Sequence, residues 1–147
     1  MNPKFDTMYM AMANLAADCS TAVRLRVGSV VVKDHRVLSI GYNGMPAGWD
    51  NDCEFQEFFP DGSDKMVTKP EVLHAEENAI VKMARDGQAS KGATMYCTHA
   101  PCMQCAKLIY GSGIQTLIYE SEYRDTNGTS FLEASGVKVV HRKPTGN

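Results

Sequence analysis

The sequence lacks several features that mark large classes of protein. No apolar run approaches the roughly 18 residues that a membrane-spanning helix needs, so we expect no contact with a membrane. The N-terminal segment has neither the basic start nor the continuous apolar stretch of a secretory signal, which predicts a cytoplasmic protein. An excess of one charge is also missing. The net charge of −2 gives no electrostatic reason to expect nucleic-acid binding.

A disulfide framework is a further feature that the sequence does not favour. The chain has five cysteines, an odd number, and thiols in the cytoplasm stay reduced. Free thiols or metal binding are therefore the better interpretation. With 147 residues, 44% of them hydrophobic, the chain is long enough to bury a core without such cross-links. We expect a single domain over residues 1–147.

Apolar periodicity and turn signals predict an alternation of helices and strands. Helices are expected at residues 4–18, 71–85, 102–113 and 127–136, and strands at 27–32, 37–42, 92–100, 114–121 and 137–142. Between them, residues 45–70 form a long turn-rich connection without clear periodicity, which is typical of a lid or a substrate loop. The tail, residues 143–147, is expected to fray.

This order of elements predicts an α/β fold with three layers, α/β/α. Its centre is a five-stranded mixed sheet whose first two strands form an antiparallel hairpin. The helix at 127–136 separates the last two strands, so the fourth and fifth strands are expected to be parallel, joined by a right-handed crossover.

The stretch "PCMQC" at 101–105 has four possible meanings when taken alone. It fits a redox pair, half of a zinc finger, a disulfide corner or part of a catalytic metal site. His74, in "HAE", is the partner that favours the last, because it opens one predicted helix as Cys102 and Cys105 open the next. One imidazole and two thiolates are ligands that zinc prefers, and they leave a fourth tetrahedral position open.

Glu76 follows the histidine by two residues and can reach a ligand in that open position without binding the metal itself. The alternative is a closed structural zinc site in which His99 supplies the fourth ligand. A carboxylate beside the metal favours the open, catalytic arrangement, with Glu76 as its acid and base.

The pattern His-x-Glu followed by Pro-Cys-x-x-Cys is typical of zinc-dependent nucleobase deaminases. Over most of its length the chain also resembles the deoxycytidylate (dCMP) deaminase family, including its phage members. The resemblance rests on "VGSVVVKD", "GYNGMPAG", "HAEENAI", "GATMY" and "PCMQCAKLIYGSGI". It implies a cytidine deaminase-like fold and the zinc-dependent hydrolysis of dCMP to dUMP and ammonia, which supplies thymidylate synthesis.

The resemblance further implies a homohexamer that dCTP with Mg²⁺ activates and dTTP inhibits. Its nucleotide-binding stretch corresponds to Gly41, Tyr42, Asn43 and Gly44, although the same residues also fit an ordinary turn after a strand. The cations that the sequence offers for the substrate phosphate are Arg24, Arg26 and Arg124. Substrate contacts are expected from five residues: Arg26, Asn43, Ala75, Tyr123 and Arg124.

One feature departs from some phage members, which carry a second, structural zinc. Cys19 and Cys53 lie where two of its ligands are expected, but no histidine between 54 and 73 completes the set. Three alternatives to dCMP deamination stay open at this point. They are a deaminase of dCTP, a deaminase of adenosine in tRNA, and a zinc-stabilised module without catalysis.

Overall fold

The computed structural model describes residues 2–144. Its eleven elements follow the chain in the order α1 (Pro3–Asp18), β1 (Gly28–Lys33), β2 (Arg36–Tyr42), β3 (Glu54–Phe58), β4 (Asp64–Thr68), α2 (Ala75–Arg85), β5 (Thr94–His99), α3 (Met103–Gly111), β6 (Thr116–Ser121), α4 (Asn127–Ala134) and β7 (Lys138–His141). Of the tail expected to fray, residues 143–144 lie outside helices and strands, and residues 145–147 lie outside the described residues. No described helix combines the length and the apolar character needed to cross a membrane.

Five strands form a mixed sheet in the order β2-β1-β5-β6-β7. Strand β1 is antiparallel to both of its neighbours, β2 and β5, whereas β5, β6 and β7 are mutually parallel. The β1–β2 turn consists of Asp34 and His35, both with positive φ. Two-residue hairpin turns of this kind match the right-handed twist of the strands that they join. The predicted hairpin and the parallel pairing of the sheet's last two strands are therefore confirmed.

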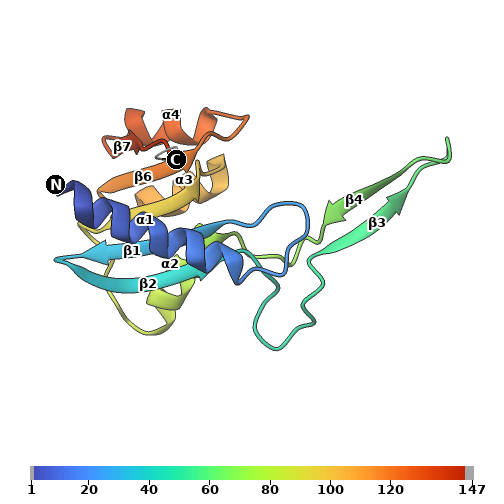
Figure 1. Cartoon of the computed structure of the whole chain (residues 1–147), viewed down its shortest axis with the longest axis horizontal. Coiled ribbons are helices and arrows are strands. Elements are labelled where there is room, and N and C mark those ends of the chain that lie inside the picture. Colours follow the sequence, from blue (N-terminus) through green and yellow to red (C-terminus); the bar gives the residue numbers. More distant parts are fainter. Residues whose placement is uncertain (1, 145–147) are drawn as a thin grey trace.

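Helices cover both faces of this sheet, as the sequence predicts (Figure 1). On one face, α1 packs Tyr9, Met10 and Ala13 against side chains of β1, β5 and β6. The opposite face is covered by α2, α3 and α4, whose buried residues include Met83, Ile109 and Leu132. Because successive residues of a strand point to opposite faces, the consecutive apolar residues in the middle of β1, β5 and β6 supply both cores: Val30–Val32, Met95–Cys97 and Leu117–Tyr119.

Two glycines allow the covering helices to approach the sheet closely. A Cβ atom on Gly28 would overlap the carbonyl oxygen of Ala13 in α1, and one on Gly41 would overlap that of Ala75 in α2. Only glycine permits backbones to pack at this distance. Gly41 thereby fixes the first turn of α2 against the sheet, directly beside His74 and Glu76.

The prediction for residues 45–70 was wrong in one respect. This segment contains the antiparallel hairpin β3–β4, which projects away from the rest of the molecule (Figure 1). Its turn uses "PDGS" with Gly62 at a φ of 88°. Neither strand is buried, and Phe55 and Phe58 are exposed. The hairpin therefore lacks the alternation of apolar and polar residues by which a half-buried strand is recognised in a sequence.

Helix α2 also starts later than the sequence predicts, at Ala75 rather than Glu71. The reason is a backbone bridge in which Gly44 and Leu73 exchange both hydrogen bonds, at 3.1 and 2.9 Å. The bridge holds residue 73 extended at the end of β2. It therefore ties the start of α2 to the edge of the sheet where β2 ends.

Candidate active site

Several chain segments meet at the edge of the sheet where β2, β5 and β6 end. Strand β5 leads into Pro101 and Cys102, β6 leads into Glu122–Arg124, and β2 leads into Asn43. The loop from α1 enters β1 at the same edge, because β1 runs in the opposite direction. Ligands of open α/β sheets bind at such an edge, outside the carboxyl ends of the strands.

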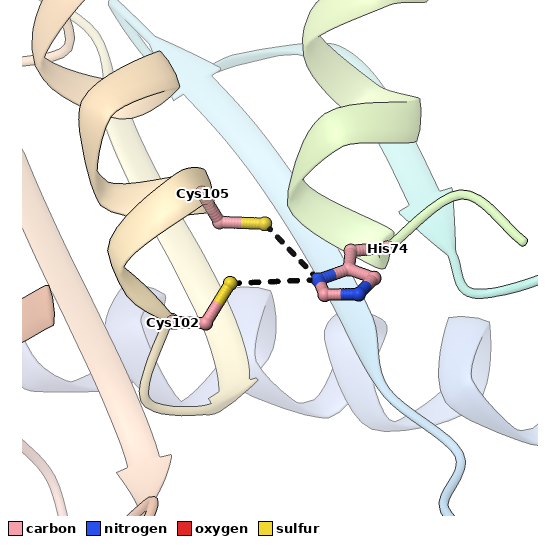
Figure 2. A group of neighbouring side chains, drawn as sticks. All are labelled: His74, Cys102 and Cys105. Atoms are coloured by element: carbon pink, nitrogen blue, oxygen red, sulfur yellow. Dashed lines mark hydrogen bonds between the residues drawn. The ribbon is translucent and has the colours of Figure 1, made fainter. Parts of the chain in front are cut away.

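His74, Cys102 and Cys105 converge at this edge, as the sequence predicts. Their ligand atoms lie within 4.8 Å of one another. Among residues 2–144, no other three histidine, cysteine or acidic side chains bring their ligand atoms as close together. Figure 2 shows both sulfur atoms pointing toward one nitrogen of the imidazole. The distances from His74 Nδ1 are 3.6 Å to Cys102 Sγ and 3.3 Å to Cys105 Sγ.

These separations fit a zinc ion. With zinc–sulfur bonds of about 2.3 Å and zinc–nitrogen bonds of about 2.0 Å, tetrahedral angles place N and S ligands about 3.5 Å apart. The observed distances are close to this value without any rearrangement. His74 Nδ1 would therefore bind the metal together with both thiolates.

Two helix N-termini support the three ligands. His74 is the N-cap of α2, where its backbone N–H donates to the Glu77 carboxylate, and Cys102 is the N-cap of α3. The positive end of a helix dipole favours a thiolate over a thiol. Two hydrogen bonds lower the pKa of Cys102 to about 4, the one with Cys105 having the larger effect and the one with His74 the smaller. The hydrogen bond that Cys105 donates to Cys102 raises the pKa of Cys105.

Glu76 lies in the first turn of α2 and is almost completely buried, with 4% of its surface exposed. Burial raises its pKa above that of an ordinary glutamate. Its neighbours include the thiols of Cys97 and Cys105, and it is not a member of the ligand group. A carboxylate with a raised pKa beside an open metal position is suited to accept and return a proton near neutral pH.

His99 does not complete a closed site. Its Nδ1 atom pairs with the Thr98 hydroxyl at 2.9 Å, and burial lowers its pKa, which favours the neutral imidazole. Among the described residues, the ligand group comprises only His74, Cys102 and Cys105. Three protein ligands with a fourth position open is the arrangement of catalytic zinc sites.

A pocket of about 640 Å³ opens beside this cluster. The lining includes His74, Glu76 and Cys102 together with four of the five residues for which substrate contact is predicted, namely Asn43, Ala75, Tyr123 and Arg124. Their substrate contacts stay predictions. The Asn43 amide is already used within the protein, because it donates to the Leu25 carbonyl at 2.7 Å and accepts from the Val27 amide at 2.8 Å.

Arg26, the fifth predicted residue, does not line the pocket. It is exposed, and its Nε atom donates to the Ala22 carbonyl at 3.3 Å. The neighbouring Arg24 lines the pocket instead. The two arginines are two residues apart in a segment without helix or strand, so sequence periodicity could not tell which one faces the ligand.

The predicted nucleotide stretch 41–44 has several structural roles. Gly41 is buried under α2 and Gly44 bridges to Leu73, whereas Tyr42 is partly exposed with the Lys82 ammonium 5.9 Å from its ring centre. Of these residues, only Asn43 lines the pocket. An effector site at this stretch stays a prediction.

Cys19 and Cys53 are free thiols that the structure does not bring into a metal-binding group. Cys19 is exposed and directs its Sγ atom to the Leu15 carbonyl of its own helix. Cys53 is buried, with its Sγ atom 3.6 Å from the Thr21 hydroxyl. Within residues 2–144 there is no support for the second zinc.

Sequence reasoning missed two pocket residues that come from the projecting hairpin, Glu54 and Thr68. They are opposite each other at its base, as the first residue of β3 and the last of β4. The turn signal "PDGS" between two short runs rich in aromatic and β-branched residues could have revealed this hairpin, and with it the pairing of its ends.

Comparison with known proteins agrees with the geometry of the site. The model of the cytidine and deoxycytidylate deaminase zinc-binding region matches residues 3–121. The deoxycytidylate deaminase of Mycobacterium phage D29 is 39% identical over 126 residues, which are 82% of this chain and 97% of that protein. The one from Saccharomyces cerevisiae is 37% identical over 143 residues, or 95% of this chain. The chain spans about half the length of the two yeast relatives, 45% and 46%.

A solved structure extends the agreement to the fold. The dCMP deaminase from the cyanophage S-TIM5, in complex with dCMP and dUMP, has a TM-score of 0.86 and 40% identity to this protein. The match covers 97% of this chain and 99% of that one. The match to the zinc-binding region of the family supports zinc as the metal that His74, Cys102 and Cys105 would hold. Both the zinc-binding region and the arrangement of the sheet and helices thus place the chain in the cytidine and deoxycytidylate deaminase family.

Proposed function

We propose that the protein hydrolyses the C4-amino group of dCMP, giving dUMP and ammonia. The observation that carries this proposal is the buried Glu76 beside a three-ligand zinc site, within a pocket that also contains two arginines. The dCMP and dUMP complex of the cyanophage enzyme supports the same substrate. Supply of dUMP to thymidylate synthesis follows from the product.

Glu76 would move the protons that this hydrolysis requires. A zinc ion held by the three ligands supplies the nucleophile, because it lowers the pKa of water to about 7. Glu76 accepts one proton from the attacking water and delivers it to N3 of the pyrimidine ring, which makes C4 more electrophilic. It then accepts the second proton of that water from the hydroxyl group added at C4 and delivers it to the amino nitrogen, which leaves as ammonia while the C4 carbonyl forms. Burial suits Glu76 to this role, since it raises the pKa of the carboxyl group.

The phosphate of dCMP would be bound by cations at the pocket. Arg24 and Arg124 both line it, and Tyr123 lies between Arg124 and the end of β6. An arginine offers five N–H donors in a planar fork that matches phosphate oxygens. Asn43 and Ala75 would complete the substrate contacts, with Asn43 acting through the loop that its amide holds.

Further features belong to the same proposal. They are a homohexamer, activation by dCTP with Mg²⁺, inhibition by dTTP and a cytoplasmic location. The support for them is the family to which the chain belongs. A site for these effectors at Gly41–Gly44 would have to use mainly Tyr42 and Gly44, because Gly41 is covered by α2.

The test is to incubate the zinc-loaded protein separately with dCMP, dCTP and tRNA, and to measure dUMP, dUTP and inosine. We expect dUMP as the main product and one zinc ion per chain. Addition of dCTP with Mg²⁺, or of dTTP, to the dCMP reaction then tests regulation. Formation of dUTP without dUMP would indicate a dCTP deaminase. Inosine without either product would indicate a tRNA adenosine deaminase, and no product at all would favour a zinc-stabilised module.

A further inference from the structure

One wall of the pocket is built from a segment that has no helix or strand of its own. Residues 19–27 connect α1 to β1, and four residues of this segment line the pocket: Ala22, Arg24, Leu25 and Val27. Val23 and Arg24 are exposed. Without backbone pairing to a neighbouring strand, such a loop takes a fixed conformation only if other groups hold it.

On one side, the projecting hairpin holds this loop through a single carboxylate. Glu54 Oε2 accepts hydrogen bonds from the backbone amides of Val23 and Arg24, at 2.9 and 3.0 Å. Hydrogen bonds from amides to a carboxylate are about twice as strong as those to a neutral acceptor. Because the two amides are consecutive, their common acceptor fixes the backbone at the residue that carries the arginine side chain.

The hairpin also contacts the side chain of Arg24. The Thr68 hydroxyl accepts from Arg24 Nη1 at 3.3 Å, and Thr68 is the partner of Glu54 in the β3–β4 register. The base of the hairpin therefore binds both the backbone and the guanidinium of one residue. This hydrogen bond uses one of the five donors of Arg24 and directs the side chain along the pocket, which Glu54, Thr68 and Arg24 all line.

On the other side, Asn43 fixes the loop where it enters β1. Its side-chain amide donates to the Leu25 carbonyl and accepts from the Val27 backbone N–H. The backbone carbonyl of Asn43 accepts from the Ser20 hydroxyl at 2.6 Å. Asn43 therefore holds both ends of the loop. Glu54 holds the middle, at Arg24.

We propose that Glu54 is a positioning residue that gives the enzyme its preference for a phosphorylated substrate. It acts through Arg24, by holding the guanidinium where the 5′-phosphate of the nucleotide binds. This inference rests on the proposed function, since it assumes that a nucleoside monophosphate occupies the pocket. The β3–β4 hairpin is then part of the substrate site, although it lies outside the sheet that carries the metal ligands.

The test compares dCMP with deoxycytidine, which lacks the phosphate, in steady-state assays of Glu54→Ala. We expect kcat/KM for dCMP to fall about tenfold or more through KM, and that for deoxycytidine to change less than about twofold. Glu54→Gln keeps an acceptor oxygen for the two amides and should retain most of the activity. Glu57→Ala, on the exposed part of the same strand, is the matched control and should behave as wild type.

A double-mutant cycle with Arg24→Ala decides whether Glu54 acts through Arg24. We expect Glu54→Ala to have little further effect on dCMP turnover once Arg24 is absent. Additive losses, equal losses on both substrates, or an unchanged Glu54→Ala enzyme would overturn the inference while leaving dCMP deamination intact. Failure of the wild-type protein to deaminate dCMP would overturn the proposed function, and this inference with it.

Discussion

The metal ligands and the pocket arginines are held in place by different kinds of structure. His74, Glu76, Cys102 and Cys105 lie at the first turns of two helices that pack on the sheet, and Cys105 and Glu76 are buried. Arg24 and Arg124 are exposed and lie in segments without helix or strand. The proposed chemistry would thus be built on rigid elements, whereas the proposed recognition of the phosphate would depend on loops that a few side chains hold.

This contrast predicts that substitutions among the arginines change substrate binding and spare the metal. Arg124→Ala should raise KM for dCMP about tenfold to a hundredfold, because a hydrogen-bonded charge pair contributes about 1.5–3 kcal/mol. Its zinc content should equal that of the wild type. Steady-state kinetics with metal analysis would measure both quantities.

Arg26→Ala is the matched control for that experiment. Arg26 is also an exposed arginine in a segment without helix or strand, but it does not line the pocket. We expect its KM for dCMP to stay within about twofold of wild type. A larger effect from Arg26 than from Arg124 would reverse the assignment of the pocket residues.

A smaller effect, on zinc affinity, is expected from a substitution that does not contact the metal ligands' side chains but displaces the loop that carries Cys102. Gly128, at the start of α4, packs so closely on the loop before α3 that a Cβ atom would overlap the Pro101 carbonyl oxygen and lie 2.9 Å from that of Cys102. Gly128→Ala should displace Cys102 at a cost of about 1–3 kcal/mol, which weakens zinc binding about tenfold. Competition with a metal chelator would measure this loss.

Gly111→Ala provides the comparison for Gly128. It makes the same chemical change on α3, at a position where a Cβ atom meets nothing within 4 Å. We expect its zinc affinity to match the wild type. Equal zinc affinities for the Gly128 and Gly111 variants would show that the contact of α4 with the metal loop does not position Cys102.

The same contrast explains what the sequence could predict. The metal ligands and Glu76 were recognisable because a zinc site of this kind requires His-x-Glu and Pro-Cys-x-x-Cys at fixed spacing, and the mixed sheet followed from the alternation of helices and strands. The structure confirms that His74, Cys102 and Cys105 converge. Gly128 and Gly41 gave no such signal, because a close approach of two backbones depends on residues distant in the sequence.

The loops were less predictable for a physical reason. An exposed hairpin has no apolar face, so β3 and β4 show no periodic pattern of hydrophobic residues. The two backbone amides that donate to Glu54, those of Val23 and Arg24, lie 31 and 30 residues away in the chain. Arg24 and Arg26 are chemically identical, and only the hydrogen bonds of the folded loop separate them. Such contacts follow from tertiary structure and not from local spacing.

Glu76 is proposed to move protons beside a zinc site that His74, Cys102 and Cys105 would hold. The most direct measurement is the rate of dUMP formation from dCMP by Glu76→Gln, with zinc content measured on the same sample. We predict one zinc ion per chain, as in the wild type, and a kcat lower by about 10²–10⁴-fold. Undiminished turnover by the zinc-loaded variant would contradict a proton-transfer role for Glu76, and loss of the zinc itself would contradict its separation from the metal ligands.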